Sequence, residues 1–333
     1  MERITHCAAL FLLLLLPFVA AAQDGCAYFV HKFRALEYAY NDQPDSSLIE
    51  YRRAFAVHTR DMADLLTAAQ IAFQRDSLDA AALFLQAAAE SGLAWPDVPV
   101  SLMASARDAG ITDGDRWQTH FRGLPPGADV ALIARVRRLA ELDQSVRPDE
   151  GEVDTRTLWA ADSLNAAELR AIVAELGRLP GYSDLGWEGL DDLDLLFHHL
   201  QLEDLQFFMP YIIANIRTGE YLDNTTIAYQ IDRIAVAEGR VLYIDETDHL
   251  QCLSARQTPL AGRAYWSVTG EWEDFLPDGR SVLWPVFPGL GEKGANLTRQ
   301  RLCLDSLEHG ARRKPWLKQA TAKEVRTAFG IRD

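Results

Sequence analysis

Two pairs of polar side chains have the residue types and the spacing that acid–base or ligand-binding chemistry needs. Asp143 and Arg147 are one helical turn apart, so a carboxylate and a guanidinium share one face, where they hold a polar ligand or form an ordinary ion pair. His199 and Glu203 are also one turn apart, a spacing that suits a metal site or an acid–base pair. The sequence offers no clear third metal ligand, so we predict neither a metal nor a cofactor.

A third candidate lies in a strongly apolar segment. Asp232 and Arg233 stand between Ile231 and Ile234. Adjacent side chains of a helix point in different directions, so at least one of the two charges is expected to have a buried partner. A structural ion pair is the default explanation for such a residue.

The order of these residues resembles the signature of a domain-of-unknown-function family of exported bacterial proteins. That signature has Asp-Gln-x-x-Arg, a later Asp-x-x-Asn before a helix, a helical His, and Asp-Arg-Ile before a strand. Between residues 139 and 243 the chain supplies Asp143, Gln144, Arg147, Asp162, Asn165, His199, Asp232 and Arg233. The resemblance implies a shared fold and a shared polar site, and no particular reaction.

Two departures from the signature concern polar positions. The chain has Gln201 where the family has an acid after the histidine, and residues 241–245, which include Tyr243, replace a Gln-x-Tyr-Gly-Thr strand. If the family's site is catalytic, the resemblance implies that this member is impaired.

Three functions are compatible with the pattern. The leading hypothesis is an exported binding protein, in which helical repeats contact a protein or peptide and a second domain has a polar cleft. The alternative is a hydrolase-like enzyme with His199 as general base and an arginine that orients an anionic group. It requires convergence of the candidate catalytic residues Asp143, Arg147, His199, Asp232 and Arg233, with Gln144, Asp162, Asn165 and Tyr243 as ligand-binding candidates. The third is a structural ionic network, which converges in the same way without solvent access.

The elements before these residues are predicted to be helical hairpins. Apolar stripes over 61–92, interrupted at 75–77, indicate two antiparallel helices, and a shift of about 34 residues brings earlier alanines and tyrosines into the same register. Residues 23–122 therefore resemble tetratricopeptide repeats, with plain helical hairpins as the alternative. Such arrays leave a concave face that binds partners.

The candidate site lies in a predicted α-helical domain over 128–239. Its first helix ends before Pro148, residues 148–161 are expected to form a polar loop, and Asn165 with Glu168 predicts a capping box at the start of the next helix. Further helices are expected at about 188–200, 204–218 and 223–238. The fold class is thus mostly α, an α bundle after the hairpins.

Residues 240–333 change in character. Short β-type runs at 241–244, 250–253, 264–268 and 282–284 predict a small antiparallel β appendage in an otherwise irregular region, and the chain is expected to close with a helix at about 321–329.

The amino terminus predicts export. An apolar stretch from Cys7 to Ala22 ends in small residues, which is typical of a signal peptide cleaved after Ala22. An anchoring helix is the alternative, but the run is shorter than the roughly 20 residues that cross a bilayer. No other segment is apolar enough to span one, so we expect a periplasmic or secreted protein without membrane insertion after cleavage.

The net charge bears on the class of ligand, and the cysteines bear on disulfide bonding. With 48 acidic and 33 basic residues the net charge is −15, which argues against general nucleic-acid binding. The mature chain would keep Cys26, Cys252 and Cys303, and export permits a disulfide. The sequence does not establish the pairing; Cys252 with Cys303 is our expectation. Oligomeric state is left open.

Overall fold

A computed structural model describes ten segments of the chain. These are residues 26–58, 61–94, 98–110, 123–147, 154–221, 223–238, 241–253, 273–275, 281–283 and 291–304. Helices dominate them, and the strands form two short antiparallel pairs. The predicted fold class, mostly α with a small β appendage, is confirmed. The predicted signal peptide lies outside the described residues.

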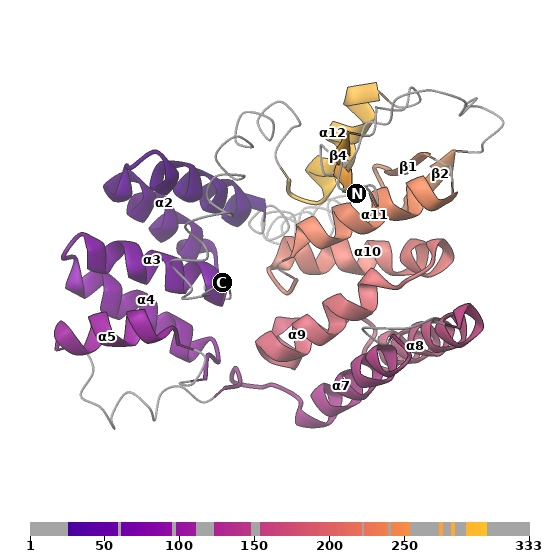
Figure 1. The fold of residues 1–333 in the computed structure, drawn as a ribbon, viewed down its shortest axis with the longest axis horizontal. Coiled ribbons are helices and arrows are strands. Elements are labelled where there is room, and N and C mark those ends of the chain that lie inside the picture. Colours follow the sequence, from indigo (N-terminus) through magenta and orange to yellow (C-terminus); the bar gives the residue numbers. More distant parts are fainter. Residues whose placement is uncertain are drawn as a thin grey trace, which may run out of the picture.

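The first group of helices occupies one end of the molecule (Figure 1). Residues 26–40 are helical, and they are followed by α2 (Pro44–Val57), α3 (Met62–Gln74), α4 (Leu78–Glu90) and α5 (Val100–Asp108). The expected hairpin is formed by α3 and α4, which pack together across a turn at Arg75 and Asp76. Their shared core is rich in buried alanines, whose small side chains let two helices lie close together.

The second group forms the helical domain at the other end of the molecule (Figure 1). It consists of α7 (Val130–Ser145), α8 (Thr155–Leu176), α9 (Tyr182–His198), α10 (Leu202–Thr218) and α11 (Asn224–Glu238). Helix α7 packs against both α8 and α9, and α9 packs against α11. The aliphatic and aromatic faces of these helices make one large core, to which the helix of residues 26–40 contributes Tyr28 and Phe29.

Helix α8 begins earlier than the sequence predicts. The capping box at Asn165 is wrong, and so is the polar loop for residues 154–161. Asp154 is the N-cap instead, because its carboxylate accepts the backbone N–H of Arg156 at 3.1 Å. The consequence for the site is that Asp162 and Asn165 lie one turn apart in the middle of one helix, and Asn165 is buried.

Helix α9 contains a kink at Gly186. Its φ of 67° lies in the left-handed region, which glycine adopts without the steric cost of a Cβ. A Cβ at this position would also come within 3.0 Å of the ring of Pro125 in the preceding connection. The kink therefore lets that connection pack against α9.

The C-terminal part adds β structure on top of the helical domain. β1 (Val241–Ile244) pairs antiparallel with β2 (Leu250–Leu253), and β3 (Glu273–Phe275) pairs with β4 (Ser281–Leu283). Helix α12 (Gly291–Arg301) packs against β1. The strand expected at 264–268 and the helix expected at 321–329 lie outside the described residues.

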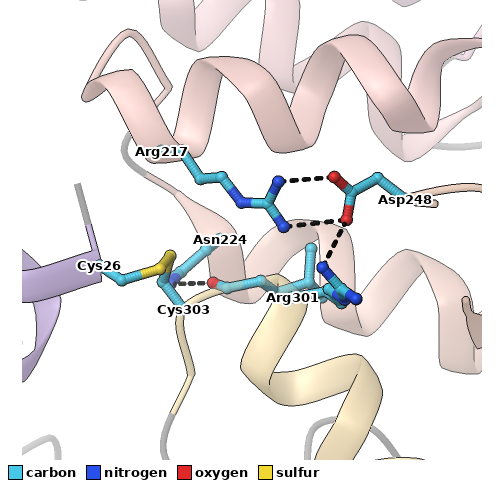
Figure 2. The surroundings of a disulfide bond; sticks show 7 residues. Cys26, Arg217, Asn224, Asp248, Arg301 and Cys303 are labelled. Atoms are coloured by element: carbon cyan, nitrogen blue, oxygen red, sulfur yellow. Dashed lines mark hydrogen bonds and ion pairs between the residues drawn. A yellow bond between two sulfur atoms is a disulfide. The ribbon is translucent and has the colours of Figure 1, made fainter. Parts of the chain in front are cut away.

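A disulfide links the two ends of the described chain. It joins Cys26 to Cys303, so the expected pairing of Cys252 with Cys303 is wrong. The physical reason is that Cys252 lies in β2, whereas Cys303 follows α12 and meets the helix of residues 26–40 (Figure 2). Among the described cysteines, Cys252 is outside the disulfide.

Polar contacts hold α12 beside this disulfide. The side-chain amide of Asn224 donates to the backbone carbonyl of Leu302 at 2.8 Å. Asp248 forms ion pairs with Arg217 at 2.5 Å and with Arg301 at 3.4 Å (Figure 2). The disulfide thus fastens the first helix to a C-terminal segment that is already tied to α10 and α11.

No described helix combines the length and the apolar character that crossing a membrane would take.

Candidate functional site

Asp143 is the buried centre of a polar cluster in the helical domain. Its residue is fully buried near the C-terminal end of α7. Carboxylate oxygen Oδ1 lies 2.7 Å from Nη1 of Arg147, and Oδ2 lies 2.9 Å from Nδ1 of His199. Gln144 donates its amide to Oδ2 at 2.9 Å. A buried carboxylate needs such compensation, because water no longer solvates it.

Arg147 connects α7 to α8. Its guanidinium also donates to the backbone carbonyl of Asp143 at 2.9 Å and forms an ion pair with Asp162 of α8. Both carboxylates are more than nine-tenths buried, and the arginine side chain is 19% exposed. The pair of Asp143 and Arg147 predicted from the sequence is therefore part of a larger cluster, in which Arg147 forms ion pairs with two carboxylates.

His199 lies at the end of α9, where the helix stops. Its backbone N–H bonds the carbonyl of Leu196, and a short break before α10 separates it from Glu203. The ring faces Asp143 with Nδ1, so Nε2 is directed away from that carboxylate, and the side chain is 26% exposed. The approach to Asp143 is close but not aligned as a hydrogen bond. A carboxylate that faces one imidazole nitrogen and leaves the other to solvent is an arrangement that general bases use.

Arg233 brings α11 to the same place. Its Nε donates to Oε1 of Gln230 at 2.9 Å, and its Nη2 lies 3.4 Å from the carbonyl of Leu200, the residue after His199. Burial lowers the pKa of Arg233, while Asp162 acts to raise it and Arg147 to lower it, so these charges are near one another. Within the part of the chain that the structure describes, no carboxylate forms an ion pair with Arg233.

Gln230 was not among the residues predicted from the sequence. It is fully buried, and its amide donates to the carbonyl of Leu200 at 3.0 Å while its oxygen accepts from Arg233. The signal was present, since a glutamine three residues before an arginine shares its face in an otherwise apolar helix. Gln230 holds the arginine in place without reaching the surface itself.

Asn165 contributes buried and unsatisfied polar atoms. The residue is 3% exposed, and neither its oxygen nor its amide nitrogen has a hydrogen-bond partner among the described residues. It lies one turn after Asp162 on α8. Buried amides are nearly always paired, so Asn165 is unusual among the buried polar residues of this domain.

Two predicted residues do not take part in these contacts. Asp232 is fully buried beside Arg233, but the ion pairs that join Asp143, Arg147 and His199 do not include it. Tyr243 lies in β1 opposite Gln251 of β2. Gln144 touches the cluster through Asp143. We call the five ionisable residues of the cluster the polar site: Asp143, Arg147, Asp162, His199 and Arg233.

The described residues contain no group of three or more His, Cys, Asp or Glu side chains arranged to hold a metal ion. Searches of family models, of curated proteins and of solved structures find no match to this chain. The resemblance to a family of exported bacterial proteins therefore stays a prediction, and the argument about function depends on the geometry of the polar site.

Proposed function

We propose that this chain is an exported binding protein, and that the polar site takes a small anionic ligand. The observation that carries the proposal is the half-buried guanidinium of Arg233. Its Nη2 lies 3.4 Å from the carbonyl of Leu200, the residue after His199, and it has no carboxylate of its own among the described residues. A guanidinium binds carboxylates and phosphates through paired donors, and its affinity for them rises where water is partly excluded.

The charges of the polar site leave Arg233 free for such a ligand. Asp143 and Asp162 both face Arg147, which lies between them. The second arginine is therefore a positive charge that the protein has brought into a partly buried position without a counter-ion. Holding it there is costly, and an anionic ligand offsets that cost. His199 adds a second positive charge when it is protonated.

Two observations support export. The amino terminus has the apolar run and small residues of a signal peptide. The disulfide between Cys26 and Cys303 is a bond that persists in oxidising compartments and is rare in the cytosol.

The helical hairpins are proposed as a second platform, for a protein or peptide. Their tetratricopeptide-like spacing suggests this role. Leu83 of α4 is 64% exposed and Val100 of α5 is 78% exposed, which adds apolar surface to this part of the molecule.

Thermal unfolding with added anions tests the polar site. Inorganic phosphate, acetate and succinate would be titrated against residues 23–333, against Arg233→Gln, and against Arg156→Gln, which removes an exposed arginine of α8. We expect at least one anion to raise the unfolding temperature of the wild type and of Arg156→Gln, but not of Arg233→Gln. Equal shifts in all three proteins, or no shift with any anion, would contradict the proposal.

A hydrolase-like enzyme is the second candidate, and the contact between Asp143 and His199 favours it. With Nδ1 facing the carboxylate at 2.9 Å, Nε2 would take a proton from water, and Arg233 would orient an anionic substrate. Hydrolysis of p-nitrophenyl phosphate and p-nitrophenyl acetate measures this directly. The enzyme hypothesis expects turnover that His199→Gln abolishes. If an anion binds and is not turned over, only the binding function is supported.

A further inference from the structure

A cavity lies where the first helical group meets the helical domain. Its volume is about 340 Å³, at the small end of the range for ligand sites. One side is formed by Lys32 and Phe33 of the first helix and by Asp61 at the start of α3; the other is formed by α9 and by the segment that leads into α11. None of the five residues of the polar site lines it. We call it the junction cavity.

The walls of the junction cavity are partly aromatic. Phe33 faces it from the first helix, and Trp187 and Leu190 face it from α9. Trp187 directly follows the kink at Gly186 and is only partly covered by its neighbours. An indole face of this kind attracts cations as well as apolar groups.

The one lysine at the junction cavity is already neutralised. The ammonium of Lys32 lies 2.7 Å from Asp61 and 3.0 Å from Asp64, two buried carboxylates. Tyr28 donates its hydroxyl to Asp64 at 2.7 Å. Burial and the neighbouring Asp61 raise the pKa of the Asp64 carboxyl to about 7, and Asp61 by itself already pairs with the Lys32 ammonium. Lys32 therefore has no unpaired charge to offer an anion.

The opposite wall carries carboxylates without a matching cation. Asp194 accepts the hydroxyl of the buried Tyr221, and Asp223 accepts the backbone N–H of Thr226 at the start of α11. Asp191 is one turn before Asp194 on α9 and stands at the rim. Among the described residues no lysine or arginine forms an ion pair with any of the three. His198, which is charged only when protonated, lies 3.8 Å from Asp194.

Burial of Asp194 raises the pKa of its carboxyl to about 6, and the neighbouring Asp223 adds to the rise. A carboxylate in this position is stabilised by any positive charge that enters the cavity.

We propose that the junction cavity binds a small organic cation, an ammonium or guanidinium group on an apolar body. Asp194 and Asp191 pair with the charge, and Trp187 and Phe33 pack against the apolar part. A divalent metal ion suits the site less well, because the described carboxylates are not gathered as a metal-binding group and because the aromatic wall would have no function.

Calorimetric titration of the purified protein with phenethylamine tests this proposal, with 2-phenylethanol as the neutral probe of the same shape. We expect the amine to bind and the alcohol to bind at least about tenfold more weakly, as follows from losing one charge-assisted contact. Asp191→Asn and Asp194→Asn should each weaken amine binding by about tenfold or more, whereas Asp79→Asn, an exposed acid of α4, should leave it unchanged.

Asp191→Asn guards against a folding artefact, because Asp191 is exposed and makes no hydrogen bond that its replacement would break. The proposal is overturned if the alcohol binds as well as the amine, which would make the cavity merely apolar. It is also overturned if Ca²⁺ competes with the amine for the site, or if both variants bind the amine as the wild type does.

Discussion

Asp143→Asn is predicted to destabilise the fold far more than the loss of a surface charge would. The substitution keeps the size of the side chain and removes the charge that faces Arg147 and His199. Breaking a buried ion pair costs about 3–5 kcal/mol, because the remaining charge stays buried without compensation. Arg147 keeps its ion pair with Asp162, so we expect the free energy of unfolding to fall by the lower end of this range, about 3 kcal/mol.

The assay is urea denaturation followed by circular dichroism. For an m-value of about 3 kcal/mol per molar urea, a loss of this size lowers the midpoint by about 1 M. The matched control is Asp45→Asn, which removes a carboxylate 3.1 Å from Arg75 in a pair whose side chains are 73% and 47% exposed. Exposed pairs contribute about 0–1 kcal/mol, so the control should unfold near the wild type.

A double-mutant cycle with His199→Gln examines the contact itself. If Asp143 and His199 interact as their 2.9 Å separation indicates, the double variant should lose less stability than the sum of the two single losses, by about 0.5–3 kcal/mol. The reasoning is refuted if Asp143→Asn unfolds at the same urea concentration as Asp45→Asn, or if the two losses simply add.

Three further predictions concern the disulfide, the kink and the junction cavity. Cys303→Ser should lower the free energy of unfolding by about 3–5 kcal/mol, because the disulfide closes a loop of 277 residues. Reduction of the wild type should have the same effect. Cys252→Ser should leave the change that reductant causes in the denaturation curve unaltered. Gly186→Ala should lower the unfolding temperature more than Gly177→Ala, because Gly186 has φ 67° and ψ −171°, which glycine alone adopts readily, and its Cβ would also meet Pro125. Gly177 lies in the left-handed helical region with open space around it. Backbone strain of this kind is about 1–3 kcal/mol. Burial raises the pKa of Asp194 above its ordinary 3.8 to about 6, so its contribution to the stability of the ligand-free protein is present below pH 4 and lost as pH rises through about 6. Amine affinity should change the opposite way, falling as pH is lowered through 6; flat calorimetric affinities across that range would contradict this.

The helices were predictable because their apolar periodicity is local information. The hairpin of α3 and α4 and the helices α10 and α11 all follow the stripes of the sequence. The start of α8 was missed because two capping signals compete, and the sequence does not rank Asp154 above Asn165.

The candidate site was predictable only in part. Asp143 and Arg147 are one turn apart, so their pairing can be inferred from spacing, but Asp162 and His199 reach them from other helices. His199 was a candidate because of its spacing to Glu203, and Asp162 was included only through the family resemblance. The disulfide and the junction cavity were missed for the same physical reason, since each joins segments far apart in the chain whose approach only the packing of the two helical groups decides.

The most direct test of the account is an NMR titration of the His199 imidazole with phosphate, acetate and succinate, with the signal assigned through His199→Gln. The polar site predicts that at least one anion shifts the His199 ring resonances in the wild type, and that Arg233→Gln removes the shift while leaving the spectrum of the fold intact. If no anion moves His199, or if the same shift persists in Arg233→Gln, the polar site does not bind anions through Arg233 and the central proposal is wrong.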